Sequence, residues 1–334
     1  MLQRLLLPLV MLLLSTPVVA VSFLDQPLVE AFIDKLVEQD GFDKQQLTTW
    51  FKQVQYQSSI IDAFNRPKEE TSSYKSYKPM FVSDETIKRG EAFAQQYRVA
   101  LMRAEYVYGV PAEVILAIVA IESRFGRTMG SYRVFDALAT SGFFYQRRAE
   151  YFQKELREFL LITRSQKIDP FSVKGSYAGA MGYPQFMPSS FQAYAVDFDY
   201  DGHIDIWNNP VDAIGSIANY FKVHGWQQDA LVAVKARVSG DHYESLIPDS
   251  MKLGATVEEV INSGWQLDVE IMDKQQQTIP FKVETEDGME YWLGLKNFYV
   301  ITRYNHSRLY ALTVHHLGLV FQQLFKSGQD QGHG

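Results

Sequence analysis

The 334-residue chain contains 32 basic and 39 acidic residues, which gives a formal net charge of −7, and 46% of its residues are hydrophobic. A chain of this length can bury one large core or two to three smaller ones. The acidic balance argues against nucleic acid as a partner, because phosphate binding needs a basic surface. Cysteine is absent, which excludes thiol catalysis and cysteine-based zinc sites.

The first 20 residues have the pattern of a secretory signal peptide. Arg4 supplies the positive charge, Leu5 to Leu14 are mostly apolar, and Val18-Val19-Ala20 provide a small-residue cleavage site. An uncleaved membrane anchor is the alternative, but Pro8 and Pro17 interrupt the apolar run, which is short for a spanning helix. We therefore expect the mature chain to be exported.

Residues 26 to 110 have mainly helical periodicity. We expect the first helix to end at Gly41. Ser83 is a suitable N-cap for a long helix that ends at Gly109. Between these helices, Pro67 to Pro79 is polar and begins and ends with proline, which predicts an exposed loop.

The stretch from Pro111 to Gly126 contains the candidate catalytic residue, Glu122. Eight apolar residues, 114 to 121, precede it, so this helix should be buried on nearly every side. Pro111 suits the first helical position, and Gly126 suits the position after the last. Apolar neighbours raise the pKa of a carboxyl group, which makes Glu122 a candidate proton donor near neutral pH. The alternative is a solvated Glu or a partner of Arg124, although residues two apart on a helix do not face each other.

A Gly- and Ser-rich stretch to Phe143 comes next, followed by a predicted helix from Gln146 to about Ile162. Arg147 and Arg148 open this helix. They can bind a substrate carboxylate, which a guanidinium group fits well. The alternative is that they are solvated or pair with acidic residues of the same helix.

Residues 174 to 190, KGSYAGAMGYPQFMPSS, form a loop in which small residues allow close approach of another chain or a ligand. Gln185, Phe186 and Met187 stand between two prolines and should be held rigidly. Glycine-rich loops are common, so this pattern alone does not define a function.

The most specific spacing in the chain lies in residues 197 to 208. The positions of an EF-hand calcium loop are matched by Asp197, Asp199 and Asp201 at one, three and five, Gly202 at six, His203 at seven (through its carbonyl) and Asp205 at nine. Asn208 stands at position twelve, where a bidentate Glu is usual, and Asp212 could supply the missing carboxylate. We expect one structural calcium ion. The alternative is a chance run of acids in a surface loop.

After a helix at 212–225, the periodicity changes from helical to mainly alternating. Strands are predicted at 231–238, 266–271, 278–283 and 289–293, with a short helix at 255–262 and a hairpin turn at 286–288. Residues 298 to 305 should form a re-entrant strand or loop that lines a cleft. A final helix, 309–325, should pack against the N-terminal helices. These patterns predict a mostly α, α+β fold with a small β subdomain inserted in a helical chain.

A buried acid, nearby Arg and Tyr residues and the absence of a cofactor motif favour cleavage of a glycosidic bond. Glycosidases usually use two carboxylates, but Glu122 has no evident second one. Asp136 is the nearest acid, and Glu150 lies on the next helix. If Glu122 acts alone, the nucleophile must come from the substrate.

Several motifs in order resemble the membrane-bound lytic transglycosylase B family, whose members act on peptidoglycan. They are ESRFG at 122–126, the 174–190 loop, DFDYDGHIDIW at 197–207, VDAIGSIANYFKVHGW at 211–226 and ITRYN at 301–305. The resemblance covers nearly the whole mature chain. It implies a lysozyme-like core, an EF-hand-like calcium site and no organic cofactor.

Combined with the periodicity, the resemblance predicts the domains. We expect a signal peptide at 1–20, a helical domain at 21–105 completed by 309–326, a catalytic core at 106–225 completed by 295–308, and a β subdomain at 226–294. The lipid-anchor cysteine of membrane-bound members is absent, which favours a soluble periplasmic form. We expect a monomer that acts on glycan strands, with other cell-wall enzymes as candidate partners.

The resemblance also implies a set of site residues. Glu122 matches the single catalytic acid/base. The positions that match substrate contacts are Arg147, Arg148, Ser176, Gln185, Phe186, Tyr220, Tyr299 and Tyr304. The calcium ligands would be Asp197, Asp199, Asp201, His203 and Asp212.

The implied reaction breaks the bond between N-acetylmuramic acid and N-acetylglucosamine and leaves a 1,6-anhydromuramoyl end. Two alternatives stay open. A hydrolytic, lysozyme-type muramidase would use the same acid with an activated water. A non-catalytic peptidoglycan-binding protein would keep the cleft without needing a buried acid.

Overall fold

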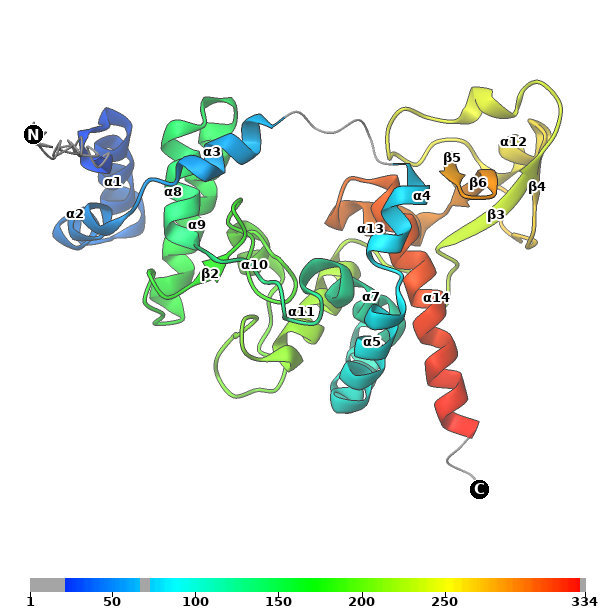
Figure 1. The fold of residues 1–334 in the computed structure, drawn as a ribbon, viewed down its shortest axis with the longest axis horizontal. Coiled ribbons are helices and arrows are strands. Elements are labelled where there is room, and N and C mark those ends of the chain that lie inside the picture. Colours follow the sequence, from blue (N-terminus) through cyan, green and yellow to red (C-terminus); the bar gives the residue numbers. More distant parts are fainter. Residues whose placement is uncertain (1–21, 67–72, 331–334) are drawn as a thin grey trace, which may run out of the picture. The chain divides into compact units, whose positions relative to one another are not determined.

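The computed structural model describes residues 22–66 and 73–330, drawn in colour in Figure 1. The predicted signal peptide at 1–20 and the first part of the predicted loop at 67–79 lie outside the described residues. The chain divides into two compact units, Met1–Tyr56 and Gln57–Gly334.

The first unit is a pair of helices, α1 (Pro27–Asp40) and α2 (Lys44–Gln53), preceded by a 3₁₀ turn at Phe23–Asp25. Gly41 ends α1 with φ of 66°, as predicted. The Asp43 side chain accepts a hydrogen bond from the Gln46 N–H at 2.6 Å and caps α2. The two helices contact each other, and the rings of Phe32 and Phe51 meet edge-on at 6.2 Å.

The second unit contains the other helices. They are α3 (Ser58–Asn65), α4 (Tyr74–Tyr77), α5 (Asp84–Gln96), α6 (Arg98–Tyr108), α7 (Ala112–Ser123), α8 (Val134–Phe144), α9 (Ala149–Ser165), α10 (Pro188–Tyr194), α11 (Pro210–Val223), α12 (Val257–Asn262), α13 (Lys296–Tyr304) and α14 (Arg308–Asp330). Among the described residues no single helix is long and apolar enough to cross a membrane, and α6 and α7 reach that composition only as a pair bent by 115°.

Helix α7 lies at the centre of this unit and contacts α5, α6, α11 and α14. Every residue from Val114 to Ala120 is buried, which confirms the predicted burial. The helix begins at Ala112, so Pro111 is its N-cap rather than its first residue. The left-handed backbone predicted for Gly126 begins two residues earlier, at Arg124, and continues to Gly126 with φ of 48°, 57° and 82°.

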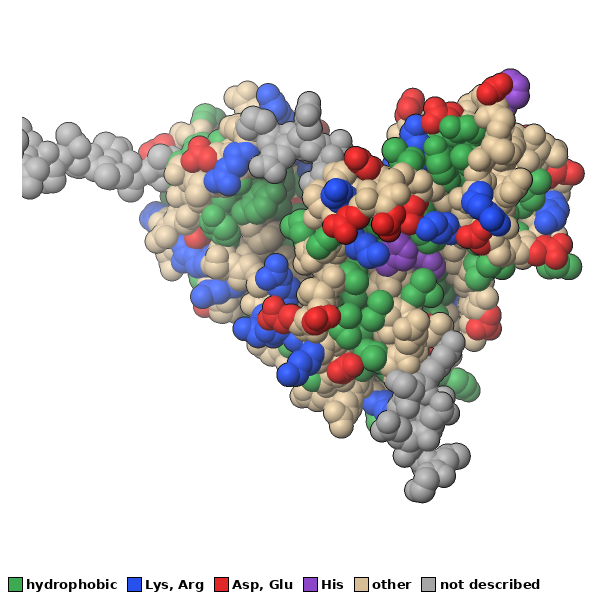
Figure 2. All heavy atoms as spheres, turned by 45° about the vertical axis from the view of Figure 1, so that its right-hand side comes forward, with side chains coloured by type: hydrophobic (Ala, Val, Ile, Leu, Met, Phe, Trp, Pro, Cys, Tyr) green, Lys and Arg blue, Asp and Glu red, His purple; other side chains and the backbone are tan. Residues whose placement is uncertain are grey.

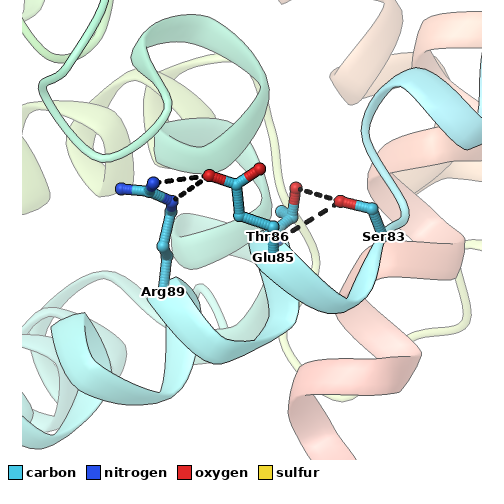
Figure 3. A network of polar contacts seen from close by, with 4 residues as sticks. All are labelled: Ser83, Glu85, Thr86 and Arg89. Carbon is cyan, nitrogen blue, oxygen red and sulfur yellow. Dashed lines mark hydrogen bonds and ion pairs between the residues drawn. The ribbon is translucent and has the colours of Figure 1, made fainter.

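The long helix predicted between Ser83 and Gly109 is in fact two helices, α5 and α6, which separate at Tyr97. Ser83 caps α5 as predicted, because its hydroxyl accepts a hydrogen bond from the Thr86 N–H at 3.3 Å (Figure 3). Gly109 ends α6 with φ of 69°. At Tyr97 the chain leaves the helical backbone region, and the ring of this residue packs on Phe93 at 4.6 Å.

Two further segments correct the sequence predictions. The second half of the expected loop at 67–79 holds α4 and a 3₁₀ turn at Lys78–Met80. Tyr74 is only 1% exposed, and its hydroxyl hydrogen-bonds to His316 Nδ1 at 2.5 Å. The Gly- and Ser-rich stretch before Phe143 contains α8, which is buried from Val134 to Phe143. Tyr74 is therefore held by α14, which is distant in sequence, whereas α8 packs mainly on the helix that follows it, α9, and also on α3.

The β subdomain is an antiparallel sheet with strand order β4-β3-β6-β5. Its strands are β3 (Ala233–Val238), β4 (Trp265–Leu267), β5 (Ile279–Thr285) and β6 (Gly288–Gly294), which confirms the predicted strands and hairpin, although β4 is shorter than expected. Ala233 and Phe281 belong to the same core as α7, whereas Val234 and Trp265 pack in a second cluster with α12. A separate strand pair joins β1 (Tyr132–Arg133) to β2 (Lys174–Gly175). The predicted α+β class, mostly α, is confirmed.

The segment after the sheet is a helix, α13, and not the expected strand or loop. Asn297 in its first turn is fully buried. Its side chain accepts a hydrogen bond from the Gln227 N–H at 2.8 Å and donates to the carbonyls of Gln227 and Ala230 at 2.7 and 3.0 Å. One amide therefore joins the segment that enters the sheet to the segment that leaves it. The final helix, α14, packs on α5, one of the N-terminal helices predicted as its partners, and also on α7 and α13, which lie outside that predicted domain.

Candidate active site

Glu122 lies in the last turn of α7 and is partly buried. Its Oε1 accepts a hydrogen bond from the Tyr310 hydroxyl of α14 at 2.6 Å. Burial raises the pKa of Glu122 to about 7, and the hydrogen bond from Tyr310 opposes that rise. A carboxyl group with this pKa can both donate and accept a proton near neutral pH.

Neither acid considered as a second carboxylate stands beside Glu122. Asp136 is buried and accepts two hydrogen bonds from the Arg133 guanidinium, at 2.6 and 3.0 Å. Glu150 is exposed in the first turn of α9. Among the described residues, only its own burial and Tyr310 are identified as shifting the pKa of Glu122, and no second carboxylate contributes.

An aromatic row leads away from Glu122 and consists of Tyr310, Tyr304, Tyr220 and Phe186. The ring of Tyr304 stacks with Tyr310 at 6.5 Å and meets Tyr220 at 4.7 Å. Phe186 lies 5.8 Å from Tyr220 and 5.9 Å from Tyr304. The structure thus brings three predicted substrate contacts together with Glu122. Phe186, Tyr220 and Tyr310 are buried, whereas Tyr304 is half-buried.

The glycine-rich loop, residues 174–190, holds its own predicted contacts in place. The Ser176 hydroxyl accepts hydrogen bonds from the N–H groups of Ala178 and Ala180 at 3.3 and 3.0 Å. Gln185 has φ of 50°, and its amide donates to the Gly182 carbonyl at 2.9 Å. The Tyr304 hydroxyl donates to the Pro184 carbonyl at 2.6 Å, which ties this loop to the aromatic row.

Two glycines in these motifs permit the close approach that the sequence predicted. A Cβ on Gly182 would lie 2.3 Å from the carbonyl oxygen of Ile206, and one on Gly126 would lie 2.4 Å from the ring of Tyr183. Tyr183 also donates its N–H to the Ile206 carbonyl at 2.9 Å. The glycine-rich loop is therefore packed between the end of α7 and the acidic loop.

Three other predicted contacts show no ring or hydrogen-bond contact with the aromatic row in the described part of the chain. Arg147 and Arg148 are exposed in a 3₁₀ turn before α9, and the Arg148 guanidinium lies 4.2 Å from the Tyr151 ring centre. Tyr299 lies beneath the cations of Lys296 and Arg303 on α13. Their roles stay predictions.

Two tyrosines near Glu122, Tyr310 and Tyr77, were not predicted as site residues from the sequence. Tyr310 donates the hydrogen bond described above, and the pKa of Tyr77 is raised by its burial and by the Glu122 carboxylate. Tyr310 stands in an otherwise apolar stretch of the predicted final helix. A buried tyrosine hydroxyl usually needs a hydrogen-bond partner, so a tyrosine in this apolar stretch could have indicated a polar group in the core. Tyr77 gave no such signal, because it stands in the segment predicted to be an exposed loop.

The acidic loop brings together three carboxylates. Oxygen atoms of Asp197, Asp199 and Asp212 lie within 4.8 Å of one another. Asp212, buried in the first turn of α11, reaches back to the loop and accepts hydrogen bonds from the N–H groups of Phe198 and Asp205 at 2.7 and 2.8 Å. Such a set of hard oxygen donors suits Ca²⁺.

The roles of two other predicted calcium ligands, the Asp201 carboxylate and the His203 carbonyl, stay predictions. Asp201 and His203 are exposed, and the Asp201 carboxylate accepts a hydrogen bond from the His203 N–H at 2.8 Å. Asn208, at position twelve of the loop pattern, donates its side-chain amide to Asp205 at 3.1 Å. The carboxylate that joins Asp197 and Asp199 therefore comes from α11.

Comparison with known proteins defines the class. Residues 25–319 match the family model described as the transglycosylase SLT domain. The chain therefore belongs to this family and is, by class, a lytic transglycosylase. It is 43% identical over 306 residues to membrane-bound lytic murein transglycosylase B of Escherichia coli K12, which covers 89% of this chain and 83% of the relative. The resemblance inferred from the sequence motifs is confirmed.

Solved structures agree with this assignment. Soluble lytic transglycosylase SltB1 of Pseudomonas aeruginosa has a TM-score of 0.87 and 47% identity, covering 90% of this chain and 100% of that one. E. coli Slt35 in complex with calcium has a TM-score of 0.83 and 42% identity, with 90% and 95% covered. P. aeruginosa SltB3 with NAG-anhNAM-pentapeptide has a TM-score of 0.79 and 30% identity, with 89% and 78% covered.

Proposed function

We propose that this chain cleaves the bond between N-acetylmuramic acid and N-acetylglucosamine in peptidoglycan, with Glu122 as its single acid and base. One observation carries the proposal. Glu122 has a pKa raised to about 7, one tyrosine on its carboxylate and no second carboxylate acting on it among the described residues. This arrangement supports a mechanism with one carboxylate, in contrast to the usual pair of glycosidases.

The proposed reaction begins with protonated Glu122, which donates its proton to the glycosidic oxygen as the bond to C1 of the muramoyl ring breaks. The aglycone leaves as an alcohol. Tyr310 keeps its hydrogen bond to Oε1 and stabilises the carboxylate that forms. The other carboxylate oxygen is then available to act as a base.

In the second step the C6 hydroxyl of the same muramoyl residue attacks C1, and Glu122 accepts its proton. The product is a 1,6-anhydromuramoyl end, no water is consumed, and Glu122 returns to its protonated state. A product of this kind, NAG-anhNAM-pentapeptide, is the ligand named for the SltB3 structure. That name supports the same outcome here.

The proposed substrate places the enzyme at the cell wall. The E. coli relative is named as a murein transglycosylase, and we infer that glycan strands of peptidoglycan bind along the aromatic row. A periplasmic location follows from this substrate and from the signal peptide predicted at residues 1–20.

We also propose that the carboxylates of Asp197, Asp199 and Asp212 hold a structural calcium ion. Their oxygens converge within 4.8 Å, and the Slt35 relative is described in complex with calcium. The ion would fix the acidic loop to α11 and thereby support the glycine-rich loop through the bond from Tyr183 to Ile206. It supplies no step of the reaction.

The test is digestion of purified peptidoglycan by the wild-type chain and by Glu122→Gln, followed by mass spectrometry of the soluble products. We expect anhydro-ended muropeptides from the wild type and a loss of about 10³-fold or more in rate from the variant. Glu113→Gln is the matched control, because Glu113 is on the same helix but bonds to Gln322 at 3.1 Å. It should keep the wild-type rate.

Products heavier by one water would instead show hydrolysis and favour the lysozyme-type alternative. Normal turnover by Glu122→Gln would show that another residue is the catalytic acid.

A further inference from the structure

A cavity of about 480 Å³ lies between α4, the turn of the β5–β6 hairpin and α14. Its floor is aromatic and consists of Tyr74, Trp292 and His316. The lining includes neither Glu122 nor any member of the aromatic row, so it is distinct from the candidate active site. This volume is within the range of small-molecule binding sites.

Charged side chains of both signs line the rim. Lys75 and Lys78 come from α4 and the following turn, and Glu286 and Asp287 come from the hairpin turn. All four are exposed, and in the described part of the chain none of them takes part in an ion pair. The face drawn in Figure 2 shows acidic, basic and histidine side chains gathered together.

The other charged pair of the cavity is already satisfied. Lys235 lies 2.6 Å from Glu290, which also accepts a hydrogen bond from the Trp292 indole at 3.0 Å. Burial lowers the pKa of His316 to about 3, so this residue is neutral at pH 7 and the floor carries no charge. The charges open to a ligand are therefore two cations on one side and two anions on the other.

We propose that this mixed-charge cavity binds a short peptide that carries both a free amine and a free carboxylate. The carboxylate would bind Lys75 and Lys78, the amine would bind Glu286 and Asp287, and the peptide body would lie on the aromatic floor. The stem peptides of peptidoglycan have this chemistry, so a neighbouring stem is the ligand we assign. That choice of ligand rests on the proposed function, whereas the site rests on the cavity itself.

The experiment is isothermal titration of the full chain with the free peptide L-Ala-γ-D-Glu-L-Lys, which has free amines and carboxylates. A second titration uses the same peptide with its amines acetylated and its carboxylates amidated. We expect Lys75→Glu with Lys78→Glu to weaken binding of the free peptide by about tenfold or more, the effect of losing one charge-assisted hydrogen bond. The blocked peptide should bind more weakly by a similar factor.

Lys88→Glu is the matched control, because Lys88 is an exposed lysine of α5 outside the cavity. It should leave the affinity unchanged. Glu122→Gln should also leave it unchanged, so that loss of glycan cleavage and loss of peptide binding are read separately.

Four results would overturn the proposal. The first is equal affinity of the wild type and the double lysine variant, and the second is equal affinity for the free and blocked peptides. The third is loss of binding in Arg147→Ala with Arg148→Ala but not in the lysine variant, which would place the peptide at Arg147 and Arg148 instead of in this cavity. Absence of binding at millimolar peptide would also refute it.

Discussion

Two regions of this molecule use carboxylates in opposite ways. Glu122 stands at the end of an apolar helix, where burial raises its pKa to about 7 and one tyrosine bonds to it. Asp197, Asp199 and Asp212 lie in or beside a polar loop. Backbone N–H groups donate to Asp197 and Asp212, as Gly202 does to Asp197 at 2.8 Å, and the Asn209 side-chain amide donates to Asp199 at 2.9 Å. The first environment favours a neutral acid, and the second holds several carboxylates together.

The difference shows that surroundings and not residue type decide the chemistry of a carboxyl group. A lone acid among apolar groups keeps a proton that it can transfer. Acids that converge need a cation to balance them, and oxygen donors at this density suit Ca²⁺. A change in either region should therefore affect activity or stability, and catalysis by Glu122 should respond most strongly.

Glu122→Asp should lower the rate of peptidoglycan cleavage by about 10²-fold, because a shorter side chain withdraws the acid from the glycosidic oxygen by more than 1 Å. Asp keeps the carboxyl group, so this variant tests only the position of that group. Rates of muropeptide release measure the effect, and circular dichroism checks the fold. A rate within threefold of the wild type would show that the carboxyl position is not critical.

Calcium removal by a chelator should lower the melting temperature by about 5–10 °C if calcium is present at about 100 times its Kd, a stabilisation of about 2.7 kcal/mol. Asp199→Asn should abolish this response, because Asp199 belongs to the group of three. Asp201→Asn is the control and should retain it. An equal loss in both variants would restore Asp201 as a ligand.

Glu122→Gln should make the folded state more stable at pH 8 than the wild type, by about 1–2 kcal/mol. The pKa of Glu122 is raised from 4.5 to about 7 in the folded state, so protonated Glu122 contributes stability below pH 4.5 that is lost as pH rises through 7. Gln does not titrate, and the two chains should be similar at pH 4.5. Urea unfolding at both pH values measures the difference.

The control for this comparison is Glu150→Gln, since Glu150 is exposed on α9. Its stability relative to the wild type should not differ between the two pH values. If Glu122→Gln stabilised the folded state as much at pH 4.5 as at pH 8, the gain in stability would not come from titration of Glu122.

Tyr310→Phe should shift the alkaline limb of the pH–rate profile upward by about one pH unit. The tyrosine hydroxyl stabilises the ionised form of Glu122 and so lowers its pKa, and its loss lets burial raise the pKa further. Tyr304→Phe is the control, because the Tyr304 hydroxyl bonds to the Pro184 carbonyl. An unshifted limb in Tyr310→Phe would mean that the hydrogen bond does not tune the acid.

Local patterns predicted what is local in this structure. The burial of α7 and the position of Glu122 followed from eight apolar residues in succession, and the acidic loop followed from alternating aspartates. The reach of Asp212 back to that loop was predictable because only a short connection separates them. Asp201 was predicted as a ligand from its spacing alone, and this role stays a prediction; one of its carboxylate oxygens accepts a hydrogen bond from the His203 N–H.

Contacts between distant segments could not be read from these patterns. Tyr310 is 188 residues from Glu122, and Tyr74 is 242 residues from His316. Local periodicity contains no information about such pairs. Helix α8 was not predicted, because Gly142 and its small neighbours have weak helix propensity. The helix is stabilised by tertiary packing against α9, which the local sequence of α8 does not reveal.

The amide of Asn297 has a consequence for how this architecture can vary. The Asn297 side chain and the backbone hydrogen bond from the Leu295 N–H to the Val232 carbonyl together close the base of the inserted sheet, so the chain leaves and re-enters the helical framework at one point. The entropic cost of closing a loop grows only slowly with the length of the loop. Longer hairpins in the sheet should therefore be tolerated as long as the contacts of Asn297 are kept. New segments can be inserted at the outer edge of the sheet without disturbing the catalytic helix, α7.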